Sequence, residues 1–551
     1  MNRWSNHESS IQITYRVIVL ILVVLLGFGS PFVLGTDNQA SASSNAVATA
    51  VDVGSFHTCV VLQVDSLSCW GLGEYGRLGY GNTEWIGDNE SPSKYGNVPV
   101  GGEVKKVTVG NAHTCVLIGT GAIRCFGRGS TGALGYGNTN NVGDDETPAS
   151  VGDVPLGGTA TAISAGAYHT CALMSTGSVR CWGEAGSGRL GYGVGPNQFG
   201  NYESIGDNET PASVGDVPLG GTATAISAGA EHTCALMSTG SVRCWGEATY
   251  GRLGYGNTND VGDNETPASV GDVLLGGTAR AVSAGGHVTC ALMLTGSVRC
   301  WGRQYLGYGG NRTLVGDNET PASVGDVPLG GTSTAISVGH ETICARLTTN
   351  NIRCWGDGGS LQLGYGNANN IGDDETPSSV GDVPVGVDVL EVSTADSHTC
   401  AVLSLARVRC WGSGLYGKLG YSSSGNRGFN EFPSSLPDVD FGLKPTALTT
   451  SPTSNTPTSP TSPKSMKRET VVKANINLSE RALLRLSGLV KLPGSKVKMV
   501  LDVASRRVCS LKSGGIYPRT VGLCRAKLTV VTRDKKSSSN WISLRVTKTG
   551  K

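Results

Sequence analysis

The chain has 551 residues, of which 81 are glycine and 16 are cysteine, and only 16% are charged. This composition, with almost no helical periodicity, excludes a helical bundle and favours turn-rich β structure that is larger than one small core. The net charge of +1 conceals a division, because from Lys464 onward 21 Lys and Arg stand against 4 Asp and Glu, whereas residues 36–463 hold 21 against 38.

The N-terminal segment, residues 1–49, is the first predicted element. Arg3 and Arg16 precede an uncharged stretch over residues 17–34, and small residues follow at Ala40–Ala42. This order predicts a secretion signal with a short spacer. The alternative is an uncleaved membrane anchor, since the stretch approaches the roughly 18 to 20 apolar residues that cross a bilayer. In either case we expect a secreted, cell-envelope or cell-surface protein.

A repeat occupies residues 50–442. The segment "HTCALMSTGSVRCWG" runs from His169 to Gly183 and recurs unchanged from His232 to Gly246. A fixed period with short strands and glycine turns predicts an all-β circular array, and seven units suit a closed β-propeller. Seven copies each carry two cysteines ten residues apart, namely Cys59 and Cys69, Cys115 and Cys125, Cys171 and Cys181, Cys234 and Cys244, Cys290 and Cys300, Cys344 and Cys354, and Cys400 and Cys410.

Each copy predicts a disulfide-linked hairpin. Ser175-Thr176-Gly177 form a three-residue turn with glycine at the left-handed position, which places Cys171 opposite Cys181. Directly opposed residues of an antiparallel pair satisfy disulfide geometry, and an exported chain meets oxidising conditions. Each bridge would add roughly 2 to 3 kcal/mol. Buried thiols and zinc are the alternatives, although one such hairpin supplies only two of the four ligands of zinc.

The segments "HTCALMSTGSVRCWG", "GSGRLGYG" and "TPASVGDV" together resemble the regulator of chromosome condensation repeat. The resemblance implies a seven-bladed propeller over residues 50–442. The first copy starts at "ATAVDVGSFHTC", so we expect the last stretch, "FPSSLPDVDFG", to complete the first blade. The tryptophans of the Trp-Gly positions are expected to be packing residues; they are Trp70, Trp182, Trp245, Trp301, Trp355 and Trp411, with Phe126 replacing one.

Function does not follow from this fold. The founding member of the family is a nuclear nucleotide-exchange factor for a small GTPase, a partner that an exported chain does not meet. The Gly-Trp-Arg-His-Thr motifs of the plant ultraviolet-B receptor are missing. A secreted bacterial propeller of this kind inhibits β-lactamase, and this resemblance makes an inhibitor of a secreted enzyme the alternative function.

Strand direction predicts which loops share an end of the propeller. The "AGAYH" turn and the "GEAGSG" loop share one end, and the acidic insert "GYGNTNNVGDDETPASVGDVPLGG" is expected at the opposite end. Turns that differ between near-identical copies on a rigid scaffold are typical of binding surfaces, although neutral variation is the alternative. The predicted contact residues are Tyr75, Arg128, Tyr168, Glu231, Tyr250, His287, His340, Glu341, Asp396 and Tyr416.

No cofactor, metal site or catalytic constellation is predicted. The repeated histidines, His57, His113, His169, His232 and His398, are expected to be structural. The acidic insert offers clustered oxygen ligands, as at Asp144, Asp145 and Glu146, so calcium is the open alternative. Its spacing matches no EF-hand loop, and such residues also cap their own turns.

The C-terminal part divides into a Pro/Thr/Ser-rich linker over residues 443–469 and a basic, β-sandwich-like domain over residues 470–551. Cys509 and Cys524 are expected to pair with each other. The positive charge predicts attraction to a polyanionic surface, with a solvated face or docking onto the acidic propeller as alternatives.

Together these observations predict an exported, monomeric scaffold that is not an enzyme and that binds a protein or glycan on one propeller face. Contact with a membrane is expected only if the N-terminal segment is uncleaved.

Overall fold

The computed structural model describes residues 48–442, apart from 64–65 and 195–202, together with the backbone of the strands between Arg468 and Thr547. The chain divides into two compact units, Met1–Ala447 and Leu448–Lys551. The predicted signal or anchor stretch and residues 443–467 of the predicted linker lie outside the described residues, and the last two residues of that linker already belong to a strand. Among the residues that are described, none belongs to a helix that is both long and apolar enough to span a bilayer.

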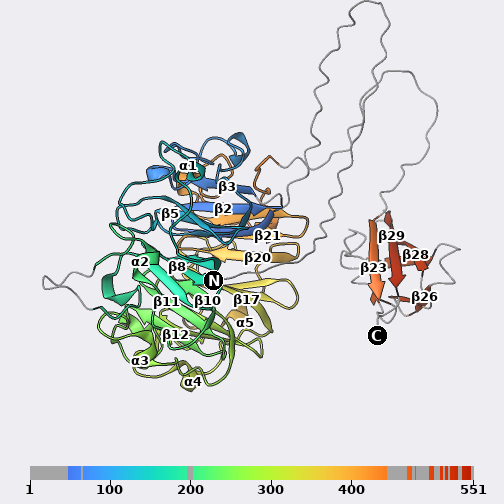
Figure 1. The fold of residues 1–551 in the computed structure, drawn as a ribbon. Coiled ribbons are helices and arrows are strands. Elements are labelled where there is room, and N and C mark those ends of the chain that lie inside the picture. The colour runs from blue at the N-terminus through green and yellow to red at the C-terminus, as the bar shows by residue number, and fades with distance from the viewer. Residues whose placement is uncertain are drawn as a thin grey trace, which may run out of the picture. The chain divides into compact units, whose positions relative to one another are not determined.

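The first unit contains seven antiparallel sheets, one for each sequence repeat, which we number as blades 1 to 7 in chain order (Figure 1). The predicted seven-bladed propeller is therefore confirmed. The strands of blades 1 to 7 are, in turn, β1 Ala48–Val53, β2 His57–Leu62, β3 Ser66–Gly71; β4 Val104–Val109, β5 His113–Ile118, β6 Ile123–Gly127; β7 Ala160–Ala165, β8 His169–Met174, β9 Val179–Gly183; β10 Ala223–Ala228, β11 His232–Met237, β12 Val242–Gly246; β13 Ala279–Ala284, β14 Val288–Met293, β15 Val298–Arg303, β16 Leu314–Val315; β17 Ser333–Val338, β18 Thr342–Leu347, β19 Ile352–Gly356; β20 Val389–Thr394, β21 His398–Leu403, β22 Arg407–Gly412.

Helices in the described propeller are confined to single turns in the loops. Five are four-residue α-helices that begin at the proline of the Thr-Pro turn, where a fixed φ suits the first helical position. They are α1 Pro148–Val151, α2 Pro211–Val214, α3 Pro267–Val270, α4 Pro321–Val324 and α5 Pro377–Val380. The 3-10 turns are η1 Glu74–Gly76, η2 Pro92–Lys94, η3 Gly186–Gly188, η4 Thr249–Gly251, η5 Leu415–Gly417 and η6 Pro433–Ser435.

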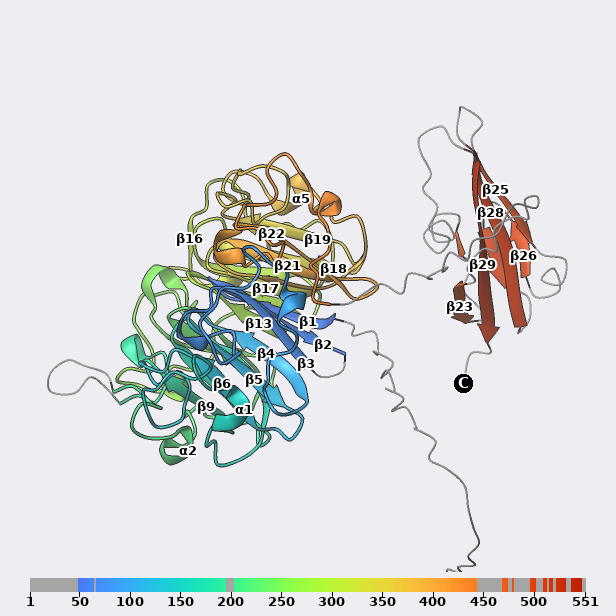
Figure 2. The same cartoon turned by 90° about the horizontal axis from the view of Figure 1, so that it is seen from above.

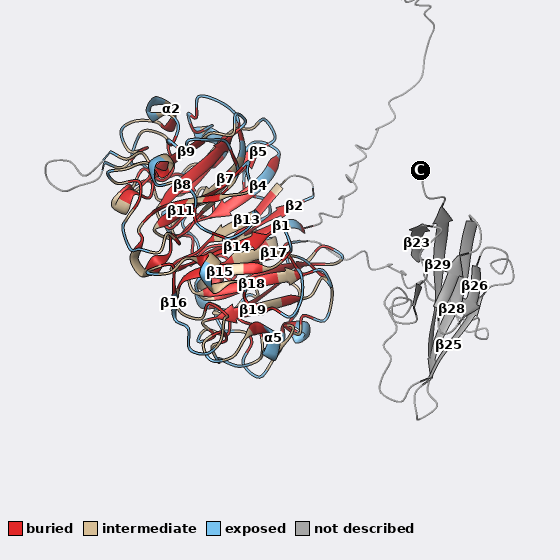
Figure 3. Ribbon diagram, turned by 90° about the horizontal axis from the view of Figure 1, so that it is seen from below, coloured by how far each residue is buried: buried red, intermediate tan, exposed pale blue. Residues whose placement is uncertain are grey.

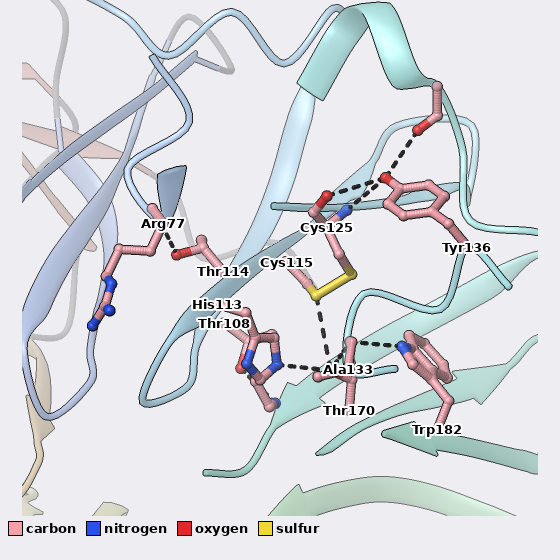
Figure 4. The surroundings of a disulfide bond; sticks show 12 residues. Arg77, Thr108, His113, Thr114, Cys115, Cys125, Ala133, Tyr136, Thr170 and Trp182 are labelled. Atoms are coloured by element: carbon pink, nitrogen blue, oxygen red, sulfur yellow. Dashed lines mark hydrogen bonds between the residues drawn. A yellow bond between two sulfur atoms is a disulfide. The ribbon is translucent and has the colours of Figure 1, made fainter. Parts of the chain in front are cut away.

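The hairpin of each blade has the register that the sequence predicts. Cys171 lies opposite Cys181 across β8 and β9, and Gly177 has a φ of +83° in the turn. All seven predicted disulfides are confirmed, each with a Cα–Cα separation of 4.1 Å. Figure 4 shows the second of them buried between two blades. In chain order, the bridges join Cys59 with Cys69, Cys115 with Cys125, Cys171 with Cys181, Cys234 with Cys244, Cys290 with Cys300, Cys344 with Cys354, and Cys400 with Cys410.

Neighbouring blades are joined through the Leu-Gly-x-Gly loop. The indole Nε1 of Trp182 donates to the carbonyl oxygen of Ala133 in the preceding blade at 2.9 Å (Figure 4). The tryptophans of the repeat and Phe126 are fully buried, which confirms their packing role. The strands form the buried interior in Figure 3, and exposed residues concentrate in the loops.

The ring closes differently from the prediction. Val439 of the last stretch donates to the carbonyl oxygen of Val408 at 2.8 Å, so "FPSSLPDVDFG" completes blade 7 and not blade 1. Instead, blades 7 and 1 are joined by the same tryptophan contact as other neighbouring blades. Trp70 Nε1 of blade 1 donates to the carbonyl oxygen of Lys418 of blade 7 at 3.0 Å. Figure 2 shows the first and last blades side by side, with β1 near β21.

The second unit is described by its backbone alone, as two sheets with strand orders β23-β29-β28-β25 and β24-β27-β26. The side chains of Cys509 and Cys524 lie outside the described residues, so their pairing stays a prediction. The strands are β23 Arg468–Lys473, β24 Leu478–Ser479, β25 Lys496–Leu501, β26 Cys509–Lys512, β27 Gly515–Pro518, β28 Gly522–Val531 and β29 Ser537–Thr547.

Candidate functional site

A belt of buried histidines links the blades. His169 Nε2 lies 2.8 Å from Thr233 Oγ1 of the next blade, and Thr233 Oγ1 donates to the carbonyl oxygen of Arg189 at 3.1 Å. Because the threonine hydrogen is used on the carbonyl, the histidine must donate from Nε2, which defines its neutral tautomer. The same pair recurs at His57–Thr114, His113–Thr170, His232–Thr289 and His398–Thr58.

The electrostatics of the belt agree with a structural role. Burial lowers the pKa of His113 to about 4, and the positive charge of Arg77 acts in the same direction. An imidazole that is neutral, buried and already bonded through Nε2 is a poor general base or metal ligand. The geometry therefore fits the structural role that the sequence suggests for these five histidines.

The turns between the first two strands of each blade lie at the same end as the loops that follow the Trp-Gly position. Leu72 of such a loop donates its backbone N–H to the carbonyl oxygen of Phe56 in the turn at 3.0 Å. We call this end the variable-turn face; it comprises residues 54–56 and 72–86 of blade 1 and their equivalents. Every predicted contact residue lies on it and is at least partly exposed.

Three of the predicted residues lie at blades 7, 1 and 2, in what we call the aromatic cluster: Phe56, Tyr75, Trp85, Arg128 and Tyr416. The ring centroid of Tyr416 lies 6.1 Å from that of Phe56 and 5.1 Å from that of Trp85. The Arg128 guanidinium lies 5.4 Å from the ring centroid of Tyr75. The Arg77 guanidinium lies 5.8 Å from the ring centroid of Phe56 and 5.6 Å from that of Tyr75, and it thereby connects the two groups into one cluster from three blades.

Phe56 and Trp85 were missed by the sequence reasoning, although Trp85 carries a readable signal. It occupies the position of Asn141 in blade 2, whose Oδ1 accepts from Gly129 N at 3.2 Å and holds the loop. Asp260, Asn370 and Asn426 do the same in blades 4, 6 and 7. Trp85 cannot accept this bond, and it is 41% exposed. Leu314 of blade 5 stands at the same position and is 37% exposed, but Trp85 also packs its ring against Tyr416 of the neighbouring blade.

Five other predicted residues lie at blades 4 to 7, in what we call the histidine cluster: Tyr250, His287, His340, Glu341 and Asp396. The imidazole centroids of His287 and His340 are 4.5 Å apart, and Tyr250 packs edge-on against His287 at 5.5 Å. His340 Nδ1 lies 4.0 Å from Asp396 Oδ1. The neighbouring cations Arg252 and Arg303 were missed. Arg252 has a counterpart in blade 3, Arg189, and does not stand out, but Arg303 replaces the glutamate that follows Trp-Gly in blades 3 and 4 and was a readable signal.

Tyr168 and Glu231, the remaining predicted residues, belong to neither cluster. Glu231 forms an ion pair with Arg189, whose side chain is buried. Tyr168 is half-buried, and its carbonyl oxygen accepts from Glu184 N at 3.0 Å. Both residues already have bonding partners within the propeller, so they are weaker candidates for contact with another molecule.

The acidic insert is only partly where the sequence places it. The end of the insert reaches the Ser-Thr-Gly turns as expected, since Thr159, the residue directly after it, accepts from Ser175 N at 2.9 Å. Its acidic part does not, because Val142 pairs with Gly127 and Gly143 accepts from Gly81 N of the preceding blade at 3.1 Å. The acids therefore lie on the rim, next to the loops of the variable-turn face. The expectation fails because the insert first pairs with the end of β6, at Gly127, and only then runs to the opposite end of the propeller.

Several acids of the insert cap their own turn, which was the alternative to calcium binding. Glu146 Oε1 accepts from Gly143 N at 3.3 Å, and Glu209 Oε1 accepts from Gly206 N at 3.2 Å. Burial and the neighbouring Asp374 and Asp373 raise the pKa of Glu375 to about 7. These contacts give the acids partners within their own turns, and calcium binding stays an untested alternative.

The centre of the ring is a channel of about 360 Å³ lined by the first strands of the blades. Most blades place a hydroxyl there, such as Ser164, which accepts from Ala228 N at 2.9 Å. Blade 1 instead places Asp52, which accepts from Val109 N at 2.9 Å, and Glu391 of blade 7 accepts from Val51 N at 3.3 Å. Burial, followed by the charge of Asp52, raises the pKa of Glu391 to about 7. Lys106 of blade 2 also lines the channel, and its positive charge acts in the opposite direction on the pKa of both acids.

Comparison with known proteins identifies a matching family, a relative in sequence and solved structures of similar fold. Residues 25–381 match the model of the RCC1-like domain. The ultraviolet-B receptor UVR8 of Arabidopsis thaliana is 28% identical over 392 residues, which cover 70% of this chain and 81% of the receptor. Human WBSCR16 has a TM-score of 0.53 at 19% identity, covering 65% of this chain and 87% of that protein. Prp20p of Saccharomyces cerevisiae has a TM-score of 0.50 at 16% identity, covering 70% and 86%.

Proposed function

Since the chain belongs to the family of RCC1-like domains, we propose that it is an exported scaffold that binds a protein partner through the aromatic cluster of its variable-turn face. Prp20p, which shares the fold, was described together with its binding to Gsp1p and to histones. Protein binding is therefore an established use of this architecture. We propose no enzymatic activity for the chain.

The composition and exposure of the aromatic cluster support a protein partner. Tryptophan, tyrosine and arginine dominate the residues that contribute most to binding energy in protein interfaces. Tyr75 and Trp85 are 40% and 41% exposed, and Leu415 beside Tyr416 is 50% exposed. Large apolar side chains gathered at one end of a rigid ring, with Arg128 at their edge, form a suitable centre for an interface.

Trp85 is the single observation that carries the proposal. At its position four other blades use Asn or Asp to hold the loop, so blade 1 gives up a stabilising hydrogen bond and gains an exposed indole. An exposed indole that makes no bond to the loop and packs beside other exposed aromatic rings supports contact with another molecule at this place.

Export is supported by the seven disulfides, which form and persist in oxidising compartments. A glycan ligand, a polyanion at the basic domain and inhibition of a secreted enzyme stay predictions that the same experiment separates. One enzyme captured in a 1:1 ratio would favour the inhibitor.

The test uses two variants of the full chain that each restore the residue common to the repeat. Trp85→Asn alters the aromatic cluster, and Leu294→Ser removes an equally out-of-place, 67% exposed side chain from the opposite end. We expect partners cross-linked in the protein's native extracellular medium to be retained by the wild type and by Leu294→Ser, and to fall at least tenfold with Trp85→Asn. Quantitative mass spectrometry measures the ratio.

Thermal unfolding provides the control for folding, since Trp85→Asn restores the bond to the loop and should unfold no earlier than the wild type. Equal partner recovery from Trp85→Asn and Leu294→Ser would contradict the proposed surface.

A further inference from the structure

Two histidines have left the buried belt and lie on the variable-turn face. In blades 3 and 4 the histidine stands two residues before the first cysteine, as at His169 before Cys171. In blade 5 this position is Val288 and the histidine stands one residue earlier, at His287; in blade 6 it is Thr342, and the histidine stands two residues earlier, at His340.

The belt is broken where these histidines leave it. The positions that hold His169 and Thr233 in blades 3 and 4 hold Val288 and Ile343 in blades 5 and 6, both fully buried. An apolar pair here replaces the hydrogen-bonded pair without leaving an unsatisfied group. The two blades thus remain packed, and their histidines are free for another role.

The backbone holds the two displaced imidazoles together. His287 N donates to the carbonyl oxygen of His340 at 3.1 Å, and Gly286 N donates to that of Gly339 at 3.1 Å. Gly286 has no side chain to separate the rings, and a Cβ there would lie 2.2 Å from His340 Cδ2. One donor atom each from His287, His340 and Glu341 lies within 4.8 Å of the others.

A shortened loop leaves this group open to solvent. The loop after Trp301 reaches Leu306 in five residues, whereas the loop after Trp245 takes eight residues to reach Leu253 and includes η4. The side chain of His340 is 41% exposed and that of Glu341 is 18% exposed. A small ligand therefore has access to the three donors.

We propose that His287, His340 and Glu341 form a binding site for a divalent transition metal of the zinc class. Two imidazoles and a carboxylate are a ligand set typical of zinc sites with three protein ligands, whose fourth position is left to water or to an atom of another molecule. Zinc bonds of about 2.0 to 2.1 Å place tetrahedral donors roughly 3.3 Å apart. The side chains must therefore close by about 1.5 Å at most, which rotations of partly exposed side chains allow.

Three contacts have to rearrange when the metal binds. Arg252 Nη2 lies 3.0 Å from His287 Nδ1, and Arg303 Nη2 lies 3.6 Å from Glu341 Oε1. The amide of Gln304, in the orientation that satisfies its bonds, donates to Glu341 at 3.1 Å. Asp396, by contrast, lies beside His340 Nδ1, where a carboxylate orients a metal-bound imidazole. Because two arginines must move, we expect micromolar affinity, weaker than that of a structural zinc site.

The test measures zinc binding to the untagged full chain after treatment with a chelator. Isothermal titration with ZnCl2 should give one site per chain that His340→Ala and Glu341→Gln each weaken at least tenfold. Co²⁺ in place of zinc should give visible absorption bands that both variants lose. The second variant keeps the test decisive if His340→Ala does not fold, as judged by thermal unfolding.

The matched control is Asp374→Asn, because Asp373, Asp374 and Glu375 form a cluster of oxygen ligands elsewhere on the rim. This variant should leave zinc affinity unchanged. The proposal is overturned if zinc does not bind below about 100 µM, if His340→Ala binds it as the wild type does, or if Asp374→Asn weakens it equally.

Discussion

At the scale of residues, the buried histidine belt explains why one side-chain pair recurs through most of the ring. His113 and Thr170 form a 2.9 Å bond between two blades, and Thr170 donates in turn to the carbonyl oxygen of Ala133 at 3.0 Å (Figure 4). A hydrogen bond between buried groups contributes about 1 kcal/mol, and losing one partner costs more because the other is left unsatisfied.

The belt makes the stability of the protein sensitive to acid. The pKa of His113 is lowered to about 4 in the folded protein, against a usual value of 6.5, so the unfolded chain binds more protons between these values. The free energy of unfolding should therefore fall as pH decreases from 6.5 toward 4. His113→Gln keeps a donor but cannot titrate, and it should remove on the order of 2 to 3 kcal/mol of this decrease.

Urea unfolding of the wild type and His113→Gln at pH 7 and pH 4.5 measures the effect. We expect the variant to be less stable than the wild type at pH 7 and to lose less stability on acidification. An identical loss in both proteins would show that His113 does not stay neutral in the folded state.

At the scale of elements, the hairpin turn illustrates how far the repeat constrains the backbone. Gly177 adopts a φ of +83°, which suits glycine and strains other residues. Blade 6 uses Asn350 at this position, with a φ of +62°, and blade 7 uses Ala406, with a φ of +60°. Asparagine tolerates this conformation, whereas alanine does not, so the turn of blade 7 is strained.

The hairpins therefore predict a reciprocal pair of substitutions. Gly177→Ala should destabilise the protein by about 1 to 2 kcal/mol, because it adds a Cβ at a positive φ and 3.1 Å from Thr222 Cβ. Ala406→Gly should stabilise it by up to about 1 kcal/mol, because it relieves the same strain. Chemical denaturation under non-reducing conditions measures both, and a loss of stability with Ala406→Gly would contradict the account.

At the scale of the whole molecule, the ring is closed by the same contacts that join every other pair of blades. The Thr58–His398 pair at 2.8 Å repeats the belt, and Ser93 N donates to the carbonyl oxygen of Asp440 at 3.1 Å, as Ala149 N does to that of Pro99 at 3.2 Å. What distinguishes the closing seam is charge. Asp52 and Glu391 line the channel there, with Lys106 of blade 2 beside them, whereas blades 3 to 6 have hydroxyl or methyl groups at these positions.

Glu391 should make the seam weaker at high pH. Its pKa is raised to about 7, so the folded protein binds more protons than the unfolded chain between about 4.5 and 7. The contribution of this group to stability is full below pH 4.5 and is lost as pH rises through 7. Glu391→Gln can still accept from Val51 N, and it should raise stability at pH 8 by roughly 1 to 2 kcal/mol after allowance for water in the channel.

The measurement compares urea unfolding of Glu391→Gln and the wild type at pH 8 and pH 4.5. The variant should be more stable at pH 8 and nearly equal at pH 4.5. A difference that is the same at both values would show that ionisation of Glu391 is not its cause. The trend is opposite to that of the histidines, so single-site variants are needed to separate the two.

Much of the architecture was readable from the sequence because its signals are local. Cysteines ten residues apart around Gly177 determine the hairpin register, and seven such copies predict seven blades. The sequence also predicted that all ten contact residues share one end of the propeller. This was possible because short turns make successive strands antiparallel, so alternate loops lie at the same end.

The partners of each side chain were decided only by the tertiary structure. Nothing local brings Trp85 to Tyr416, or His287 to His340, because these contacts join blades that are separate in sequence. The same reason explains the two wrong expectations, the last stretch as part of blade 1 and the acidic insert at the far end. In a repeat every copy is locally alike, so the sequence by itself determined the strands, the hairpin register and the disulfide of each blade. Only the closed ring decided which blades are neighbours and which of the residues that depart from the repeat are in contact.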